Sequence, residues 1–287
     1  MPDGSQNSSA DAYSPAEIAR RVKDVGVVKA KLSTFNTLAL AILAGAFIAL
    51  GGAFATVATT GSELGFGPTR VLGGVVFSLG LILVVVAGAE LFTGNNLVAM
   101  AWASRAITTR QLIRNWLLAY VGNFLGAVGT AVFVYWSGTW MAGGTAVGLN
   151  AVQIAASKCE LGFGDAFVRG VLCNALVCLA VWLCQSCRST TDKILAIIWP
   201  IAGFVALGFE HSVANMYFIP LGMLLENDPG FLTAAPVESL NTASLSAHGF
   251  LSNLISVTLG NIVGGTLLVA GVYWSVYLRN PNVSESK

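Results

Sequence analysis

Long uncharged stretches dominate the pattern of hydrophobic and polar positions along the chain. An α-helix that crosses a membrane needs about 20 apolar residues. Six segments of roughly this length hold one charged residue or none, and they predict an all-α membrane protein with six transmembrane helices. These segments are residues 35–59, 71–104, 116–136, 170–187, 194–225 and 249–278, with residues 159–167 expected as a lead-in to the fourth.

The second and fifth segments are too long for one straight crossing. A helix over 71–104 would run for about 50 Å, whereas the hydrocarbon core is about 30 Å thick. Each segment carries Glu-x-x-x-x-Asn near its middle, from Glu90 to Asn95 and from Glu210 to Asn215. Lipid leaves free backbone groups unsatisfied. We therefore expect transmembrane helices two and five to be broken, with each break facing protein or water.

A repeat relates the two halves of the chain. Residues 115–126 and 253–264 share Asn, Gly-Asn and Gly at matching positions, and Tyr-Trp follows in both at the same spacing. Three crossings per half make the halves inverted, and such repeats place the binding site near the midplane. We expect a channel domain over 33–280, with one repeat at about 33–140 and the other at about 158–279. A segment 1–32 precedes it and a tail 281–287 follows.

The positive charges predict the orientation. Twelve of the 15 Lys and Arg residues fall on one side of the six crossings. By the positive-inside rule, both termini are expected in the cytoplasm and the chain in the plasma membrane. Residues 14–31 place Ile18, Val22, Val25 and Val28 at helical spacing, which favours an amphipathic helix at the membrane surface.

Composition narrows the function. Hydrophobic residues make up 55% of the chain and charged residues 10%, whereas soluble domains carry about 25% charged residues. The net charge of +1 offers no basic field for nucleic acid. Enzyme and phosphate-loop motifs are missing, and two distant histidines suggest no metal cluster. We expect neither a cofactor nor a metal, and we read the five cysteines as packing residues.

Polar side chains at the breaks are the candidates for chemistry. His211 lies at membrane depth, where ionisable groups are usually functional and where a histidine's protonation depends on its neighbours. Thr93 can donate to an anion or contact His211, and it can equally cap the following helix. Asn261 and its repeat mate Asn123 need partners in lipid, and the sequence does not choose which one lines a pathway. An intramembrane hydrolase built on Ser212 is disfavoured because an oxyanion-hole motif is missing.

The remaining candidates allow two readings each. Lys158, on the outer side with Arg169, either raises the local anion concentration or is a solvated interfacial residue. Carboxylates at a break can accept hydrogen bonds, so Glu90 and Glu210 are expected to be structural, together with Asn95 and Asn215. Large apolar residues form either constrictions or ordinary core, and they are Phe77, Leu81, Phe92 and Phe204.

Four strings resemble signature segments of the formate/nitrite transporter family, and the resemblance runs from about residue 15 to 280. They are Gly-Ala-Glu-Leu-Phe-Thr-Gly-Asn at 88–95, Arg-Ser-Thr-Thr-Asp-Lys at 188–193, Gly-Phe-Glu-His-Ser-Val-Ala-Asn-Met at 208–216 and Thr-Leu-Gly-Asn-Ile-Val-Gly-Gly at 258–265. The resemblance implies an aquaporin-like fold without Asn-Pro-Ala boxes. It also implies a homopentamer with one pore in each protomer.

The resemblance also implies roles. The substrate pathway would comprise Thr93, His211, Asn261 and Lys158. Phe77 and Phe204 would form an outer constriction, and Leu81 and Leu91, with Phe92, an inner one. The family transports small monovalent anions, so a formate channel is expected, with proton transfer at His211 as one open route. The alternatives are a nitrite or hydrosulfide channel, which Gly94-Asn95 after Thr93 keeps open, and a proton-coupled monocarboxylate symporter.

Overall fold

The computed structural model describes residues 12–235 and 241–279, and these residues form helices and connecting loops. The tail 281–287 and residues 1–11 lie outside the described part. The elements are α1 (Pro15–Lys31), α2 (Thr34–Thr59), α3 (Phe66–Ala87), η1 (Gly94–Val98), α4 (Ala99–Ala103), α5 (Thr109–Trp136), η2 (Thr139–Met141), α6 (Ala146–Cys159), α7 (Phe163–Ser186), α8 (Thr190–Ala206), α9 (Ser212–Glu226), α10 (Pro229–Ala234), α11 (Ala247–Val263), the π-helical η4 (Gly264–Gly271) and α12 (Val272–Tyr277).

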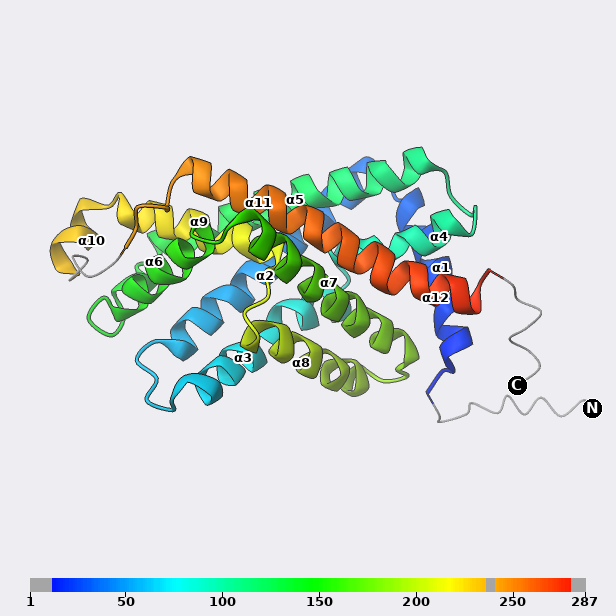
Figure 1. Ribbon diagram of the computed structural model, residues 1–287, viewed down its shortest axis with the longest axis horizontal. Coiled ribbons are helices and arrows are strands. Elements are labelled where there is room, and N and C mark those ends of the chain that lie inside the picture. Colours follow the sequence, from blue (N-terminus) through cyan, green and yellow to red (C-terminus); the bar gives the residue numbers. More distant parts are fainter. Residues whose placement is uncertain (1–11, 236–240, 280–287) are drawn as a thin grey trace, which may run out of the picture.

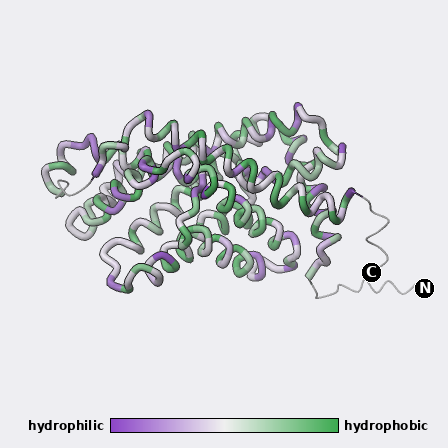
Figure 2. Tube along the Cα trace, viewed as in Figure 1, coloured by the Kyte–Doolittle hydropathy of each residue, from purple (hydrophilic) through white to green (hydrophobic). Residues whose placement is uncertain are grey.

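Five helices are long and apolar enough to cross a membrane, as judged by length and composition. They are α2, α3, α5, α7 and the continuous run from α11 to α12. The expected fifth segment is divided into α8, of 17 residues, and α9, of 15 residues. Apolar residues follow most of the helices, whereas hydrophilic ones gather at helix ends and loops (Figure 2).

The region before the fourth predicted crossing differs from expectation. Residues 159–167 were expected as a lead-in, but α6 already occupies Ala146–Cys159 and α7 begins at Phe163. A helix of 14 residues is too short to cross the bilayer, so a search for long apolar runs passes over α6. Helix α7 begins seven residues before the expected fourth segment and includes Asp165 and Arg169 in its first turns. Charged residues do not end a helix, so the limit of the uncharged run was not the limit of the helix.

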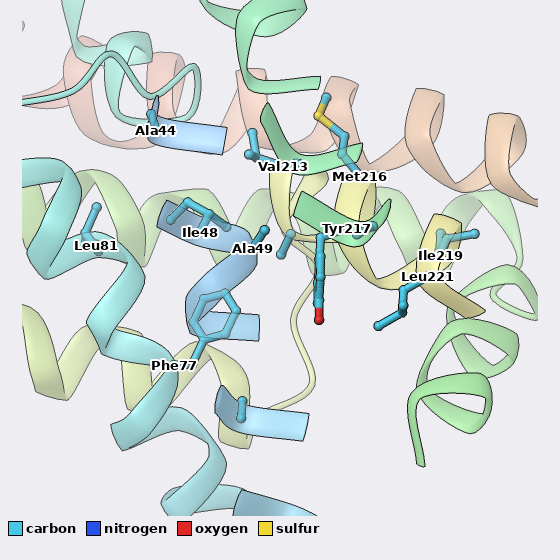
Figure 3. Close-up of a cluster of buried hydrophobic side chains, with 14 of the residues drawn as sticks. Ala44, Ile48, Ala49, Phe77, Leu81, Val213, Met216, Tyr217, Ile219 and Leu221 are labelled. Carbon is cyan, nitrogen blue, oxygen red and sulfur yellow. The ribbon is translucent and has the colours of Figure 1, made fainter. Parts of the chain in front are cut away.

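The helices lie side by side along the length of the molecule. The run from α11 to α12 extends over much of that length, with α6, α9 and α10 at one end and α1, α4 and α12 at the other (Figure 1). Helix α3 packs on α2 and α8, α5 packs on α2 and α9, and α7 packs on α8 and α11. Side chains of α2, α3 and α9 meet in the core, among them Ile48, Phe77 and Tyr217 (Figure 3).

Both predicted breaks are present, and each begins at a glycine with a left-handed backbone. Helix α3 is followed by Gly88 (φ +84°), and the last turn of α8 by Gly208 (φ +73°). The next amide in each case donates back to the preceding turn, from Ala89 to the Val84 carbonyl at 2.9 Å and from Phe209 to the Phe204 carbonyl at 3.0 Å. This geometry ends a helix and favours glycine. The chain then turns into the molecule before η1 and α9 begin.

Helix α1 forms where the sequence predicts an N-terminal amphipathic helix, and part of its apolar face packs on protein. Ile18 and Val22 are buried against η1, α4 and α7, whereas Val25 and Val28 are exposed. A capping box joins Ser14 and Glu17, and these hydrogen bonds hold the pKa of the Glu17 carboxyl below its ordinary value. Helix α1 also contacts α12, so the two described ends of the chain lie together.

The backbone at Gly88 is testable by substitution. A methyl group there would meet no atom within 4 Å, so Gly88→Ala adds only left-handed backbone strain. We expect this variant to lose about 1 kcal/mol of stability. The measurement is thermal unfolding of the purified protein in detergent. Gly129→Ala, in α5 and equally uncrowded, is the control, and equal unfolding midpoints for the two variants would contradict the strain at Gly88.

Candidate functional site

The side chains of the two breaks meet at the centre of the molecule. Thr93 Oγ1 lies 2.8 Å from His211 Nε2, although the residues are 118 positions apart in the chain. Thr93 has no exposed surface and His211 is 3% exposed. The structure therefore brings together the two residues that the sequence placed in opposite breaks.

The protein backbone fixes the orientation of the His211 ring. His211 is the N-cap of α9, and its Nδ1 accepts a hydrogen bond from the Ala214 amide at 3.1 Å. An accepting nitrogen carries no hydrogen, so the neutral ring is protonated on Nε2. That N–H donates to Thr93 Oγ1, and the Thr93 hydroxyl keeps its own hydrogen available for another acceptor.

Two asparagines hold the broken backbone. Asn261 Oδ1 accepts from the Ser212 amide at 2.9 Å, and its Nδ2 donates to the Gly170 and Glu210 carbonyls. Asn123 does the same for the first break, with the Phe92 amide at 2.8 Å and the carbonyls of Ala41 and Glu90. The Asn261 amide is thus engaged with backbone, and the described residues show no hydrogen bond between it and His211.

A Lys–Glu–Asn cluster with a buried carboxylate lies at each break, and its lysine comes from a neighbouring helix. Lys29 Nζ lies 2.7 Å from Glu90 Oε1, and Asn95 Nδ2 donates to Glu90 Oε2 at 2.7 Å. Asn95 Nδ2 also donates to Asn115, whose own Nδ2 donates to the Lys29 carbonyl. Glu90 is 4% exposed, and its carboxylate is paired with the side chains of Lys29 and Asn95.

The second cluster repeats these contacts with other residues. Lys158 Nζ lies 2.9 Å from Glu210 Oε1, and Asn215 Nδ2 donates to Glu210 Oε2 at 2.6 Å. Asn215 Nδ2 also donates to Asn253, and Asn253 Nδ2 donates to the Lys158 carbonyl. One difference is that Lys29 also donates to Asn95 Oδ1, whereas Asn215 Oδ1 has no partner within the described ranges.

Two cavities approach the centre from opposite ends. The α6-side cavity, of about 230 Å³, is lined among others by Phe77, Lys158, Phe204 and His211. The α1-side cavity, of about 530 Å³, is lined among others by Lys29, Leu81, Glu90 and Leu91. Phe77 and Leu81 are one turn apart on α3, or about 6 Å along its axis. A thin apolar layer therefore separates the cavities beside the Thr93–His211 contact.

Aromatic rings form the α6-side face of this layer. The rings of Phe77 and Phe204 meet edge to face with centroids 5.8 Å apart, and Phe204 stacks near His211 at 6.0 Å. Phe218, which the sequence did not single out, stacks on Phe77 and lies 5.5 Å from Lys158 Nζ. Phe218 lies seven residues, or about two helical turns, after His211, the N-cap of α9, and this spacing was the signal that could have identified the ring.

Leu91 and Phe92 point in different directions. Leu91 lines the α1-side cavity. Phe92 packs edge to face on Trp116 and Tyr120 of α5 and lines neither of the two cavities. The structure thus brings Leu81 and Leu91 together at the apolar layer and places Phe92 behind it.

Four polar residues of the site were not singled out as site residues by the sequence analysis. Lys29 was counted only among the charges that predict the orientation, and Asn115 and Asn253 only as part of the repeat. Asn174 on α7 donates to the carbonyls of Thr93 and Asn261 and to Asn96, and so ties both breaks together. An asparagine inside an apolar run was its signal, since a buried amide requires partners.

Comparison with known proteins gives consistent matches over nearly the whole chain. The family model described as formate/nitrite transporter matches residues 16–275. The formate channel FocA of Escherichia coli (strain K12) is 44% identical, over 94% of this chain and 96% of that protein. The probable formate transporter of Methanothermobacter thermautotrophicus is 41% identical, over 93% and 97%.

Solved structures agree with these sequence matches. A pentameric formate channel with formate bound is 42% identical and superimposes with a TM-score of 0.79, over 86% of this chain and 98% of that one. An FNT family ion channel is 28% identical, with a TM-score of 0.78 over 91% and 98%. These relatives are named as channels or transporters, and the chain is a multi-pass membrane protein.

The Lys158–Glu210 pair provides a stability test. Lys158→Met leaves the buried Glu210 carboxylate without its cation, and we expect a loss of roughly 3 kcal/mol. The double variant Lys158→Met, Glu210→Gln removes both charges and should recover at least half of that loss. The measurement is denaturant unfolding in detergent.

Lys23→Met is the matched control, because the pair between Lys23 and Asp24 is much more exposed than the pair between Lys158 and Glu210. Exposed pairs contribute little, so this variant should change stability by about 0.5 kcal/mol or less. Equal losses for Lys158→Met and Lys23→Met, or no recovery in the double variant, would contradict a stabilising buried pair.

Proposed function

The chain belongs to the formate/nitrite transporter family, and we propose that it is a channel for small monovalent anions with formate as its main substrate. The names of its relatives support formate, because FocA of Escherichia coli is a formate channel and a solved relative holds bound formate. The observation that carries the proposal is the Thr93–His211 contact between two cavities that enter from opposite ends.

The proposed mechanism follows from the cost of moving a charge through the apolar layer. An anion that loses its water shell there needs a replacement hydrogen bond. The Thr93 hydroxyl hydrogen is available, because His211 Nε2–H already donates to Oγ1. A donor that itself accepts a hydrogen bond is polarised. Thr93 therefore offers the passing anion a strengthened donor, with His211 behind it.

The other site residues take supporting roles in this proposal. Phe77 and Phe204 narrow the α6-side of the pore, and Leu81 and Leu91 narrow the α1-side. Asn123 and Asn261 hold the backbone of the breaks, and the two Lys–Glu–Asn clusters anchor the segments that carry Thr93 and His211. Lys158 belongs to one of these clusters, so Glu210 offsets its attraction for anions.

We also propose six crossings in two inverted repeats, with α3 to α4 and α8 to α9 as the broken ones. Equivalent contacts in the two halves support this topology. Asn123 and Asn261 each donate to the carbonyl of the glutamate at their break, and Lys29 and Lys158 each pair with that glutamate's carboxylate. The positive-inside rule places the α1 end in the cytoplasm, so the α6-side cavity faces outward from the plasma membrane. The pentameric relative supports a homopentamer with one pore per protomer.

The Thr93 hydroxyl is the first part of the mechanism to test. Thr93→Val keeps the shape and removes the donor, so formate flux should fall roughly tenfold or more, since hydrogen bonds to charged groups contribute about 1.5–3 kcal/mol. Thr93→Ser retains the hydroxyl and should stay within about threefold of the wild type by the same measure. The measurement is labelled formate uptake into proteoliposomes, and equal flux through the Val and Ser variants would contradict the mechanism.

Electrical recording separates the channel from the proton-coupled symporter. A formate channel moves net charge, so protein in a planar bilayer should pass a current whose reversal potential follows the formate gradient. Nitrite and hydrosulfide, tested side by side, are expected to carry smaller currents. Electroneutral uptake that requires an inward proton gradient would overturn the channel in favour of the symporter.

A further inference from the structure

Three cationic side chains line the α6-side cavity, and they differ in how their charge is matched. They are Arg70 at the start of α3, Lys158 at the end of α6, and Arg169 on α7. Lys158 is paired with Glu210 at 2.9 Å. Within the described ranges, neither arginine has a carboxylate oxygen within 4.0 Å. The excess positive charge of this cavity therefore belongs to the two arginines.

Arg70 is held in place by neutral acceptors. Its Nη2 donates to the Val205 carbonyl at 2.8 Å, and its Nε donates to the Ala206 carbonyl at 3.3 Å. Both carbonyls belong to the C-terminal end of α8, and the Val205 carbonyl also accepts from the Gly208 amide at 3.1 Å. The bonds fix the guanidinium at the start of the second break without cancelling its charge.

Arg169 has a free guanidinium. Its backbone carbonyl accepts from the Glu210 amide, which fixes this turn of α7 beside the second break. Its side chain is exposed and makes no hydrogen bond to any residue of 12–235 or 241–279. Asp165, one turn earlier on α7, is not within ion-pair distance. The planar fork of Arg169 is thus available to a ligand in the cavity.

The two guanidinium groups converge at Gly208. A methyl group on Gly208 would lie 3.1 Å from Arg70 Nη2 and 4.0 Å from Arg169 Nη1, so these nitrogens are at most about 7 Å apart. Two like charges this close in a partly buried cavity favour an anion between them. Because charge-assisted N–H···O bonds are about 2.8 Å long, one carboxylate can accept from both groups.

We propose that Arg169, together with Arg70, forms a binding subsite for planar monocarboxylates at the mouth of the α6-side cavity. A guanidinium fork matches the two oxygens of a carboxylate, whereas a single-centre anion such as hydrosulfide receives no paired contact. Phe77, Phe204 and His211 line the same cavity. A carboxylate held at the subsite is therefore positioned to enter the constriction next, and formate is favoured over hydrosulfide before either reaches Thr93.

Binding is tested apart from transport, since the choice of formate as ligand rests on the proposed function. Purified protein is treated with phenylglyoxal, which modifies arginine side chains, and the rate at each arginine is followed by peptide mass spectrometry. Sodium formate should slow modification of Arg169 at least threefold relative to sodium chloride at equal ionic strength. Arg110, an exposed arginine at the start of α5 at the opposite end, should react equally in both salts.

Transport then tests selectivity. Arg169→Lys keeps the positive charge but loses the two parallel N–H donors of the guanidinium. The formate concentration for half-maximal uptake should therefore rise about three- to tenfold. The hydrosulfide concentration for half-maximal uptake should rise by a smaller factor. Arg169→Leu should weaken the uptake of both anions at low concentration. Arg110→Lys is the matched control and should leave both half-saturation values at those of the wild type.

The outcomes separate the subsite from the proposed function. Equal rates of Arg169 modification in formate and chloride would overturn the subsite, as would an Arg169→Lys variant that changes both anions by the same factor. Protection of Arg169 by formate without any formate uptake by the wild type would support the subsite and reject the formate channel.

Discussion

Backbone groups that are freed inside an apolar molecule have to be hydrogen-bonded, and this constraint organises the centre of the protein. Where α3 and α8 end, Asn123 and Asn261 supply the missing donors and acceptors to the turns that follow. Where α9 begins, the His211 ring accepts from its first turn. The capping bond fixes the tautomer of His211, and the tautomer directs Nε2–H to Thr93. The proposed donor for the anion is therefore a consequence of how the breaks are satisfied.

The buried charges are also matched by partners. Glu90 and Glu210 are buried beside the breaks, and each is matched by a lysine and an asparagine amide. An unpaired carboxylate at either position would repel an anion and destabilise the fold. Matching leaves the layer between the cavities without net charge from these groups. The positive charge that remains in the α6-side cavity then comes from Arg70 and Arg169, which lie at the mouth of the cavity rather than at the apolar layer.

The sequence predicted the elements that depend on length and on local chemistry. Uncharged runs identified α2, α5, α7 and the run from α11 to α12, and the Glu-x-x-x-x-Asn strings identified both breaks. Helix α6 was missed because a 14-residue helix is shorter than a crossing. The meeting of Thr93 and His211 was anticipated from the repeat. The partners of Asn261 and the pairs made by Lys29 and Lys158 depend on tertiary contacts between distant segments, which no local pattern specifies.

The state of the His211 ring tests the central claim most directly. Solid-state ¹⁵N NMR of the histidine-labelled protein in lipid reports on two imidazole rings with two nitrogens each, and His248→Gln assigns their signals. We predict a neutral His211 ring at pH 7, with a bare Nδ1 and a protonated Nε2 that is hydrogen-bonded to Thr93. A proton on Nδ1, or a ring whose Nε2 signal is unchanged in Thr93→Val, would contradict the account.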